Sequence, residues 1–114
     1  MVKYMLVICD DESDPQGPRE ITSRPDHVAW IDYMQSSGVK LLGGERLRPS
    51  GDATSVRARD GEVLISDGPY VEAKEQIGGF ALIECADLDQ AIEAAARHPF
   101  AAHGVIEIRP VWAG

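Results

Sequence analysis

One histidine of this sequence has a setting that suits proton transfer. His27 falls near the start of a predicted helix, where it shares a stripe with Trp30, Ile31 and Met34. Such a stripe packs toward the interior, so the imidazole is expected to point at a sheet. Histidine exchanges protons near neutral pH and is the commonest general acid or base. The alternative is a structural histidine at a helix start, and the residue pattern leaves both interpretations open.

The segment Asp67-Gly68-Pro69-Tyr70 follows a predicted strand and offers a second chemical group. Its structural interpretation is a tight turn, because glycine and proline supply the required backbone angles. Its functional interpretation is that Asp67 is a positioned carboxylate, which orients His27 or carries a second proton step. We also take Tyr70 of this segment, and Lys74 four residues after it, as candidate substrate-binding residues.

Further candidates are the residues that can hold a substrate's charge. Arg24 lies just before the predicted helix, where it can bind an anion beside the helix N-terminus, or can equally be an exposed loop residue. Arg109 lies on the last predicted strand. His98 ends the second predicted helix and is either a partner of the helix dipole or a binding residue. The histidines have no spacing typical of a metal site. No phosphate-binding, NAD-binding or serine-nucleophile motif occurs, so we expect no cofactor.

The elements that must position these residues follow from hydrophobic periodicity and turn signals. Strands are predicted over 2–9, 39–47, 80–85 and 105–112, and a hairpin over 55–59 and 62–66 around Asp60-Gly61. Helices are predicted over 25–37 and 88–97. Residues 10–24 are predicted to form a surface loop, and 67–79 an irregular segment. Without the hairpin, the order is the ferredoxin-like split βαβ pattern of an α+β protein.

The faces of these elements predict how the layers pack. The second helix presents an apolar stripe of Leu88, Ala91, Ile92 and Ala95. On the last strand, Ile106, Ile108 and Trp112 share the face expected to pack beneath the helices. The first strand is a continuous apolar run, which predicts burial on both faces. The second sheet face mixes apolar and charged residues, so it either faces solvent or closes on another copy in a dimer.

Length and composition limit the remaining choices. The 114 residues correspond to one domain over 1–114, with 44% hydrophobic and 26% charged residues, as in soluble globular proteins. The longest apolar run, Tyr4 to Cys9, is too short to span a bilayer. No signal-peptide pattern opens the chain, so we expect a cytoplasmic protein. The net charge of −8 argues against nucleic acid as a partner. Cys9 and Cys85 fall in predicted strands and are interpreted as packed thiols.

Three segments together resemble a known family. The stretch from Ser66 to Phe80 is similar to the signature of the DGPF group within the YCII-related (YciI-like) domain family, with Tyr70 where the group has phenylalanine. The segments Ala86 to Pro99 and Gly104 to Val111 extend the resemblance over nearly the whole chain. The resemblance implies a dimeric α+β barrel of ferredoxin-like protomers, shaped like muconolactone isomerases and small monooxygenases.

The resemblance also bears on the candidate site. Arg24-Pro25-Asp26-His27 matches an Arg-Pro-x-His helix start in simpler family members, where a His-Asp pair is suspected to form an active site. His27 therefore carries over. The acidic partner's position holds His98 in this chain, and Asp67 is our substitute candidate.

Three functional hypotheses follow. The first is a cofactor-independent lyase, dehydratase or isomerase that acts on a small organic acid, with His27 as general acid or base. The second is a non-catalytic ligand-binding or accessory, regulatory homodimer. The third is a cofactor-independent monooxygenase whose pocket is lined by Trp30, Tyr33 and Tyr70. Family likeness alone does not choose between these chemistries.

Overall fold

The computed structural model describes residues 1–13 and 25–113. Within these ranges it is an α+β protein. Its strands are β1 (Val2–Asp11), β2 (Lys40–Arg46), β3 (Thr54–Arg59), β4 (Glu62–Asp67), β5 (Glu75–Cys85) and β6 (Val105–Pro110). Its helices are α1 (Pro25–Ser37) and α2 (Leu88–Ala96), with short 3₁₀ helices η2 (Ser50–Asp52) and η3 (Pro99–Ala102).

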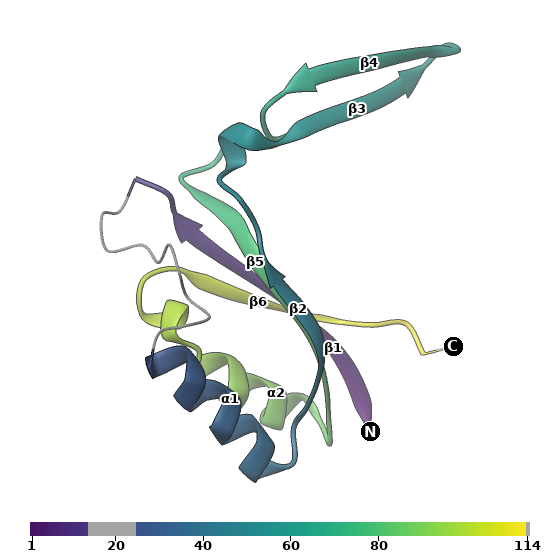
Figure 1. Cartoon of the computed structure of the whole chain (residues 1–114). Helices are drawn as coiled ribbons and strands as arrows, with labels where there is room; N and C mark the ends of the chain where they lie inside the picture. Colours follow the sequence, from purple (N-terminus) through teal and green to yellow (C-terminus); the bar gives the residue numbers. More distant parts are fainter. Residues whose placement is uncertain (14–24, 114) are drawn as a thin grey trace.

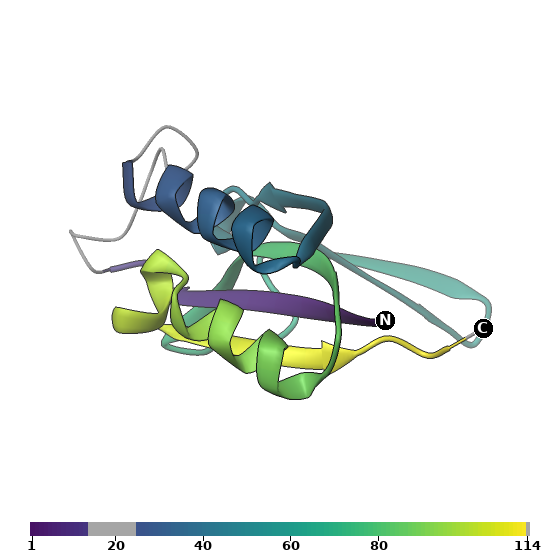
Figure 2. The same ribbon diagram turned by 90° about the horizontal axis from the view of Figure 1, so that it is seen from below.

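The main sheet is antiparallel, with strand order β2-β5-β1-β6. Both α-helices cover the same face of this sheet, and the other face is open (Figures 1 and 2). The predicted ferredoxin-like α+β fold with an inserted hairpin is confirmed. The arrangement matters for function because α1, which carries His27, lies across β2 and β5.

Local signals set the helix ends. Pro25 begins α1, where its missing N–H costs no helical hydrogen bond. Gly38 follows α1 with a φ of 83°, a left-handed conformation that glycine adopts without strain. Asp87 caps α2 by accepting a hydrogen bond from the Gln90 N–H at 2.9 Å.

The core lies between the helices and the covered sheet face. Alternate residues of β1 point into it, namely Tyr4, Leu6 and Ile8. Trp30 of α1 is 3% exposed, and its indole N–H donates to the Ala94 carbonyl oxygen of α2 at 2.8 Å. The two helices are therefore joined by a buried hydrogen bond as well as by apolar contact.

Our predictions of two apolar faces, on α2 and on the last strand, are wrong in part. Leu88 and Ile92 are both 49% exposed, because α2 turns its smaller residues inward and buries Ala94 together with Ala91 and Ala95. Trp112 is 97% exposed and does not share the covered face. The last strand ends at Pro110, although the Val111 N–H still donates to the Lys3 carbonyl oxygen at 3.1 Å.

The segment predicted to be irregular over 67–79 contains the start of a strand. β5 begins at Glu75 because β1 runs past Cys9 to Asp11 and pairs with it. Gly78 and Gly79 lower strand propensity, which hid this pairing from the sequence pattern. Burial of β1 on both faces is also not observed in the single chain, where Met5 and Val7 on the open face are half-buried.

The hairpin β3–β4 forms a separate two-stranded sheet and extends away from the main sheet (Figure 1). Asp60 and Gly61 have φ values of 52° and 78°, as a type I′ turn requires. No described helix is both long enough and apolar enough to span a membrane.

Candidate functional site

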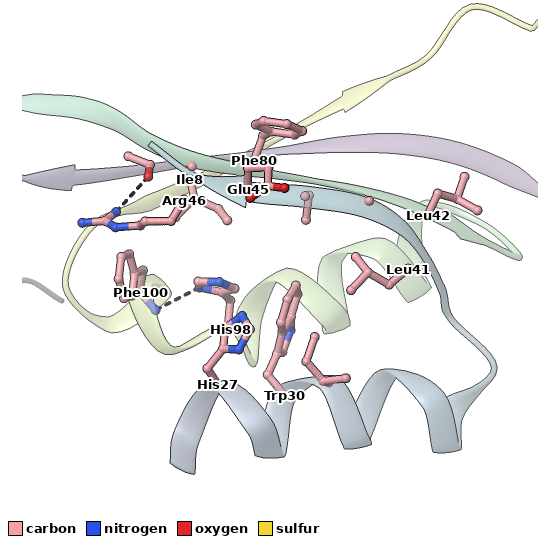
Figure 3. A pocket seen from close by; sticks show the side chains of 16 residues that line it. Ile8, His27, Trp30, Leu41, Leu42, Glu45, Arg46, Phe80, His98 and Phe100 are labelled. Atoms are coloured by element: carbon pink, nitrogen blue, oxygen red, sulfur yellow. Dashed lines mark hydrogen bonds between the residues drawn. The ribbon is translucent and has the colours of Figure 1, made fainter. Parts of the chain in front are cut away.

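A cavity of about 310 Å³ lies between α1 and the strand pair β2–β5. Its walls are aromatic and aliphatic side chains, and part of its floor is bare backbone (Figure 3). The rings are those of His27, Trp30, His98 and Phe100. The aliphatic lining residues include Ile8, Ile31 and Leu41. The volume is at the lower end for small-molecule sites, so the cavity suits a small ligand.

Glycines create this cavity. Gly44 of β2 pairs across the strands with Ala81, and Gly79 of β5 pairs with Ile8. Both partners are buried and point toward the helices, so the two glycines lie on the same face. A Cβ on Gly44 would lie 2.6 Å from the Phe80 carbonyl oxygen, and one on Gly79 would lie 3.0 Å from that of Glu45. The missing side chains let the two strands approach closely and leave space under α1.

Replacing Gly44 should therefore destabilise the fold, whereas replacing its neighbour should not. We expect Gly44→Ala to lower the free energy of unfolding by about 1–3 kcal/mol, because the new methyl group meets backbone atoms. A Cβ on Gly43 meets no atom within 4 Å, so Gly43→Ala should stay within about 0.5 kcal/mol of wild type. Urea unfolding of both variants tests this, and equal losses would contradict our account of the cavity floor.

His98 is the most buried titratable group in the cavity wall, at 4% exposure. Its Nδ1 accepts a hydrogen bond from the Phe100 N–H at 3.1 Å, so the proton of the neutral ring lies on Nε2. The ring centroid is 4.6 Å from that of Trp30 and 5.3 Å from that of Phe100. Burial, and then the nearby charge of His27, lower the pKa of His98 to about 4. The imidazole is therefore neutral at pH 7.

His27 is the more accessible imidazole. It is half-buried, with its ring centroid 5.8 Å from that of Trp30 and 6.3 Å from that of His98. Burial lowers the pKa of His27, and the carboxylate of Asp26 partly offsets this. Since the usual histidine pKa is already below 7, His27 is also mostly neutral at pH 7. The cavity thus holds two neutral imidazoles from different elements.

Half-buried Arg46 lines one end of the cavity and pairs with buried Asp10, a pair that the sequence did not predict. Arg46 donates from Nη1 to the Gly78 carbonyl oxygen at 2.9 Å, and its Nη2 lies 3.8 Å from Asp10 Oδ2. The guanidinium carbon is 5.4 Å from the centre of the Phe100 ring. Asp10 is 5% exposed, and burial raises its pKa although Arg46 opposes the rise. A Cβ on Gly78 would lie 2.5 Å from Arg46 Nη1 and 2.6 Å from Asp10 Oδ1, so any side chain here would displace both groups from their observed positions.

The comparison with protein families decides what kind of domain surrounds this cavity. The model of the YCII-related domain matches residues 2–113, nearly the whole chain. The chain belongs to the YCII-related domain family. It is also 43% identical over 74 residues to an uncharacterized protein of Rhizobium meliloti (strain 1021), a match that covers 63% of this chain. The match spans 60% of that relative's own length.

Within this YCII-related domain, the structure brings together two of the predicted site residues, His27 and His98. Asp67 ends β4 on the projecting hairpin, where it is exposed and does not line the cavity. The predicted contact of Asp67 with His27 is therefore absent, because the hairpin extends away from α1. The signal for Asp10 was its place in the inward alternation of β1, but the predicted strand ended at Cys9, two residues before the end of β1.

The other predicted binding residues also lie outside the cavity. Tyr70 is 72% exposed and its ring centre lies 4.7 Å from the guanidinium carbon of Arg57. Lys74 is exposed in the segment before β5. Arg109 is exposed on β6 and pairs with Glu107 at 3.1 Å. Arg24 lies outside the described residues. In the described ranges, no three His, Cys, Asp or Glu side chains form a group that could hold a metal ion.

The buried His98 gives the YCII-related domain a defined acid sensitivity. The unfolded chain binds a proton at His98 near pH 6.5 and the native state only near pH 4, so stability falls as pH drops through this window. The full loss is on the order of 3 kcal/mol below pH 4. Urea unfolding between pH 7 and pH 4 should show this slope in wild type and a smaller one in His98→Asn.

The control is His103→Asn, since His103 is exposed in the loop before β6. The raised pKa of Asp10 acts in the opposite direction, because protonating that buried carboxyl favours the native state. The difference between wild type and His98→Asn removes this shared contribution. Identical slopes in wild type and His98→Asn would mean that His98 is not held neutral by burial.

Proposed function

We propose that this YCII-related domain is a cofactor-independent acid–base enzyme, a lyase, dehydratase or isomerase that acts on a small organic acid. The observation that carries the proposal is the pair of imidazoles, unequal in burial and held neutral, that line one small cavity. Two titratable groups whose environments give them different pKa values are suited to separate acid and base roles.

His27 is the proton-transfer group in this proposal. Its lowered pKa leaves a lone pair available at pH 7, and its partial exposure lets it exchange protons with solvent between turnovers. It takes a proton from an acidic C–H or O–H of the substrate and returns it to a neighbouring atom or to water. The electron pair released moves into the conjugated system of the substrate or expels a leaving group.

His98 acts as a neutral hydrogen-bond donor. Its Nδ1 is occupied by the Phe100 N–H, and no hydrogen bond within the described part of the chain uses Nε2–H. This N–H is suited to a substrate oxygen on which negative charge develops as His27 removes the proton. A neutral ring suits this role because it can stabilise that oxygen without itself giving up a full proton.

Arg46 provides positive charge at the end of the cavity for the acid group of the substrate. In our hypothesis Arg46 holds the substrate's charge, a role that the sequence had suggested for Arg24 or Arg109. Asp10, Phe100 and the Gly78 carbonyl oxygen fix the guanidinium, so it is positioned before a ligand arrives. Trp30 and Phe100 offer apolar contact for a flat or unsaturated ligand.

Deuterium exchange tests the proposal even while the product is unidentified. Small unsaturated or cyclic carboxylic acids are first screened for binding by NMR shift changes at His27 and Trp30. Each ligand that binds is then incubated with the protein in D₂O, and proton NMR follows exchange of its acidic C–H. We expect catalysed exchange for at least one bound acid.

Binding without exchange for every bound acid would contradict an enzyme and would support a ligand-binding or accessory protein. The monooxygenase hypothesis has less support from the geometry. Trp30 lines the cavity, whereas Tyr33 packs against Arg97 and Tyr70 packs against Arg57.

We further propose that two copies pair through their open sheet faces. Half-buried apolar residues occupy the middle of this face, with charges of both signs around them. The apolar residues are Met5, Val7, Phe80 and Leu82, and the charged ones are Lys3, Glu84, Glu107 and Arg109. A two-fold interface must be complementary to itself, and mixed charges around an apolar centre meet that need.

The Asp67-Gly68-Pro69-Tyr70 motif supports membership of the DGPF group within the family. A cytoplasmic location is also proposed. Its support is that Cys9 and Cys85 are both free thiols, as is usual in a reducing compartment.

A further inference from the structure

We propose that the hairpin β3–β4 docks its apolar face on a second copy of this chain. The proposal rests on the pairing of open sheet faces proposed above and adds the hairpin to that interface. It commits to one occupant, the partner copy, because the position of the hairpin and the area of the sheet face both point to it.

The hairpin has one apolar face, defined by its register. Val56 lies opposite Ile65, and Ala58 lies opposite Val63, so these four side chains share one face. The residues of the other face are mainly polar, namely Ser55, Arg57, Arg59, Glu62, Leu64 and Ser66. On the apolar face, Val56 is 64% exposed, Val63 is 65% exposed and Ile65 is 68% exposed. Alternation of this kind, broken only by Leu64, is typical of a strand pair that buries one face.

The part of the chain that the structure describes does not cover this face. The hairpin is a two-stranded sheet with no ladder to the main sheet, and such a hairpin alone is marginally stable in water. Its base is fixed, since Gly68 N–H donates to the Ala53 carbonyl oxygen at 2.7 Å. Near the base, η2 is held to the end of β1 by hydrogen bonds from Ser50 to the Glu12 carboxylate. The far part of the hairpin is therefore held out from a fixed base, with its apolar face in solvent.

The position of the hairpin indicates what covers it. It leaves the end of β2 and leans to the side of the main sheet opposite the helices (Figure 1). This is the side of the open sheet face, so a body packed on that face also lies within reach of the hairpin. The extents along the principal axes are 49 × 40 × 19 Å, a flat and extended shape that is consistent with a projecting hairpin. A partner copy on the open face can contact both surfaces at once.

The area of the open sheet face supports the same occupant. At about 3.3 Å per residue and about 4.8 Å between strands, the main sheet offers roughly 500 Å² of face. A standard interface takes about 800 Å² from each partner. The hairpin face adds roughly 200 Å² by the same geometry, and it does so twice in a two-fold dimer. With the hairpin included, the area of the interface approaches the area that a stable dimer needs.

Sedimentation equilibrium of the full chain tests the proposal. Wild type should sediment at twice the chain mass of 12.4 kDa. Ile65→Lys places a charge on the apolar face of the hairpin and should raise the dimer dissociation constant at least tenfold. Leu64→Lys is the matched control, because it adds the same charge to the adjacent residue on the opposite face. It should dimerise within about twofold of wild type.

A third variant separates the two proposals about the dimer. Leu82→Lys, on the open sheet face, should yield a monomer. If Leu82→Lys is monomeric but Ile65→Lys dimerises like wild type, the sheet pairing stands and the hairpin proposal is wrong. A monomeric wild type contradicts both. None of these outcomes bears on proton transfer at His27, which deuterium exchange tests by itself.

Hydrogen exchange provides a second measurement that does not depend on a variant. The β3–β4 amides should exchange slowly in concentrated wild-type protein and rapidly after dilution below the dissociation constant. Amides of β1 and β5, which belong to the main sheet, should remain protected at both concentrations. Equal protection of the hairpin at both concentrations would overturn the proposal.

Discussion

A His27→Gln variant is expected to lose the catalysed deuterium exchange by a factor on the order of 10²–10⁴, the usual contribution of a positioned general base. Glutamine keeps a polar side chain of similar reach but cannot take up a proton near pH 7. The side chain is half-buried at the start of α1, and its ring has no hydrogen bond to another residue in the described ranges. The fold should therefore be retained, so the loss belongs to the chemistry.

Two controls make this expectation specific. Asp67→Asn should leave the exchange rate unchanged, because Asp67 lies on the exposed hairpin and does not line the cavity. Ligand binding by His27→Gln, followed at Trp30, should weaken far less than the rate. Unchanged exchange in His27→Gln would remove His27 from the mechanism.

Trp30→Ala should give the largest loss of stability among the cavity residues, about 3–5 kcal/mol in the free energy of unfolding. The side chain is 3% exposed, packs against His98 and donates a hydrogen bond to α2. Its removal leaves a cavity in the core and an unpaired carbonyl oxygen at Ala94. Urea unfolding at pH 7 measures the loss.

Trp30→Phe separates packing from hydrogen bonding. Phenylalanine retains most of the ring contact with His98 but leaves the Ala94 carbonyl oxygen without its donor, which should cost about 1–3 kcal/mol. A loss in Trp30→Phe as large as that in Trp30→Ala would show that the hydrogen bond, and not the buried ring, holds α1 to α2.

Local patterns were sufficient to predict the order of the elements. Pro25 and Gly38 marked the ends of α1, and Asp60-Gly61 marked the hairpin turn, because these signals act within a few residues. The start of β5 could not be predicted in this way. Its residues Glu75 to Gly79 have weak strand propensity, and they are extended because β1 and β2 pair with them from distant parts of the sequence.

The candidate site could be predicted only in part, because local patterns reveal some of its residues and not the contacts between distant ones. His27 was found because its helical stripe is a local property. The prediction that Asp67 contacts His27 assumed that the turn after β4 lies near the pocket. The hairpin instead places Asp67 away from the pocket. The contacts of His98 with Trp30, and of Arg46 with Asp10, depend on how α1, η3 and the strands pack together. No local pattern encodes them.

The protonation states of His27 and His98 test the central claim most directly, and they need no substrate. Long-range ¹H–¹⁵N NMR of the imidazole rings between pH 8 and pH 4 reports both charge and tautomer. Our account predicts that His98 stays neutral, with its proton on Nε2, until the pH nears 4, and that His27 titrates below its usual value of 6.5. A His98 ring that becomes charged near pH 6.5, or carries its neutral-state proton on Nδ1, would contradict the proposed site.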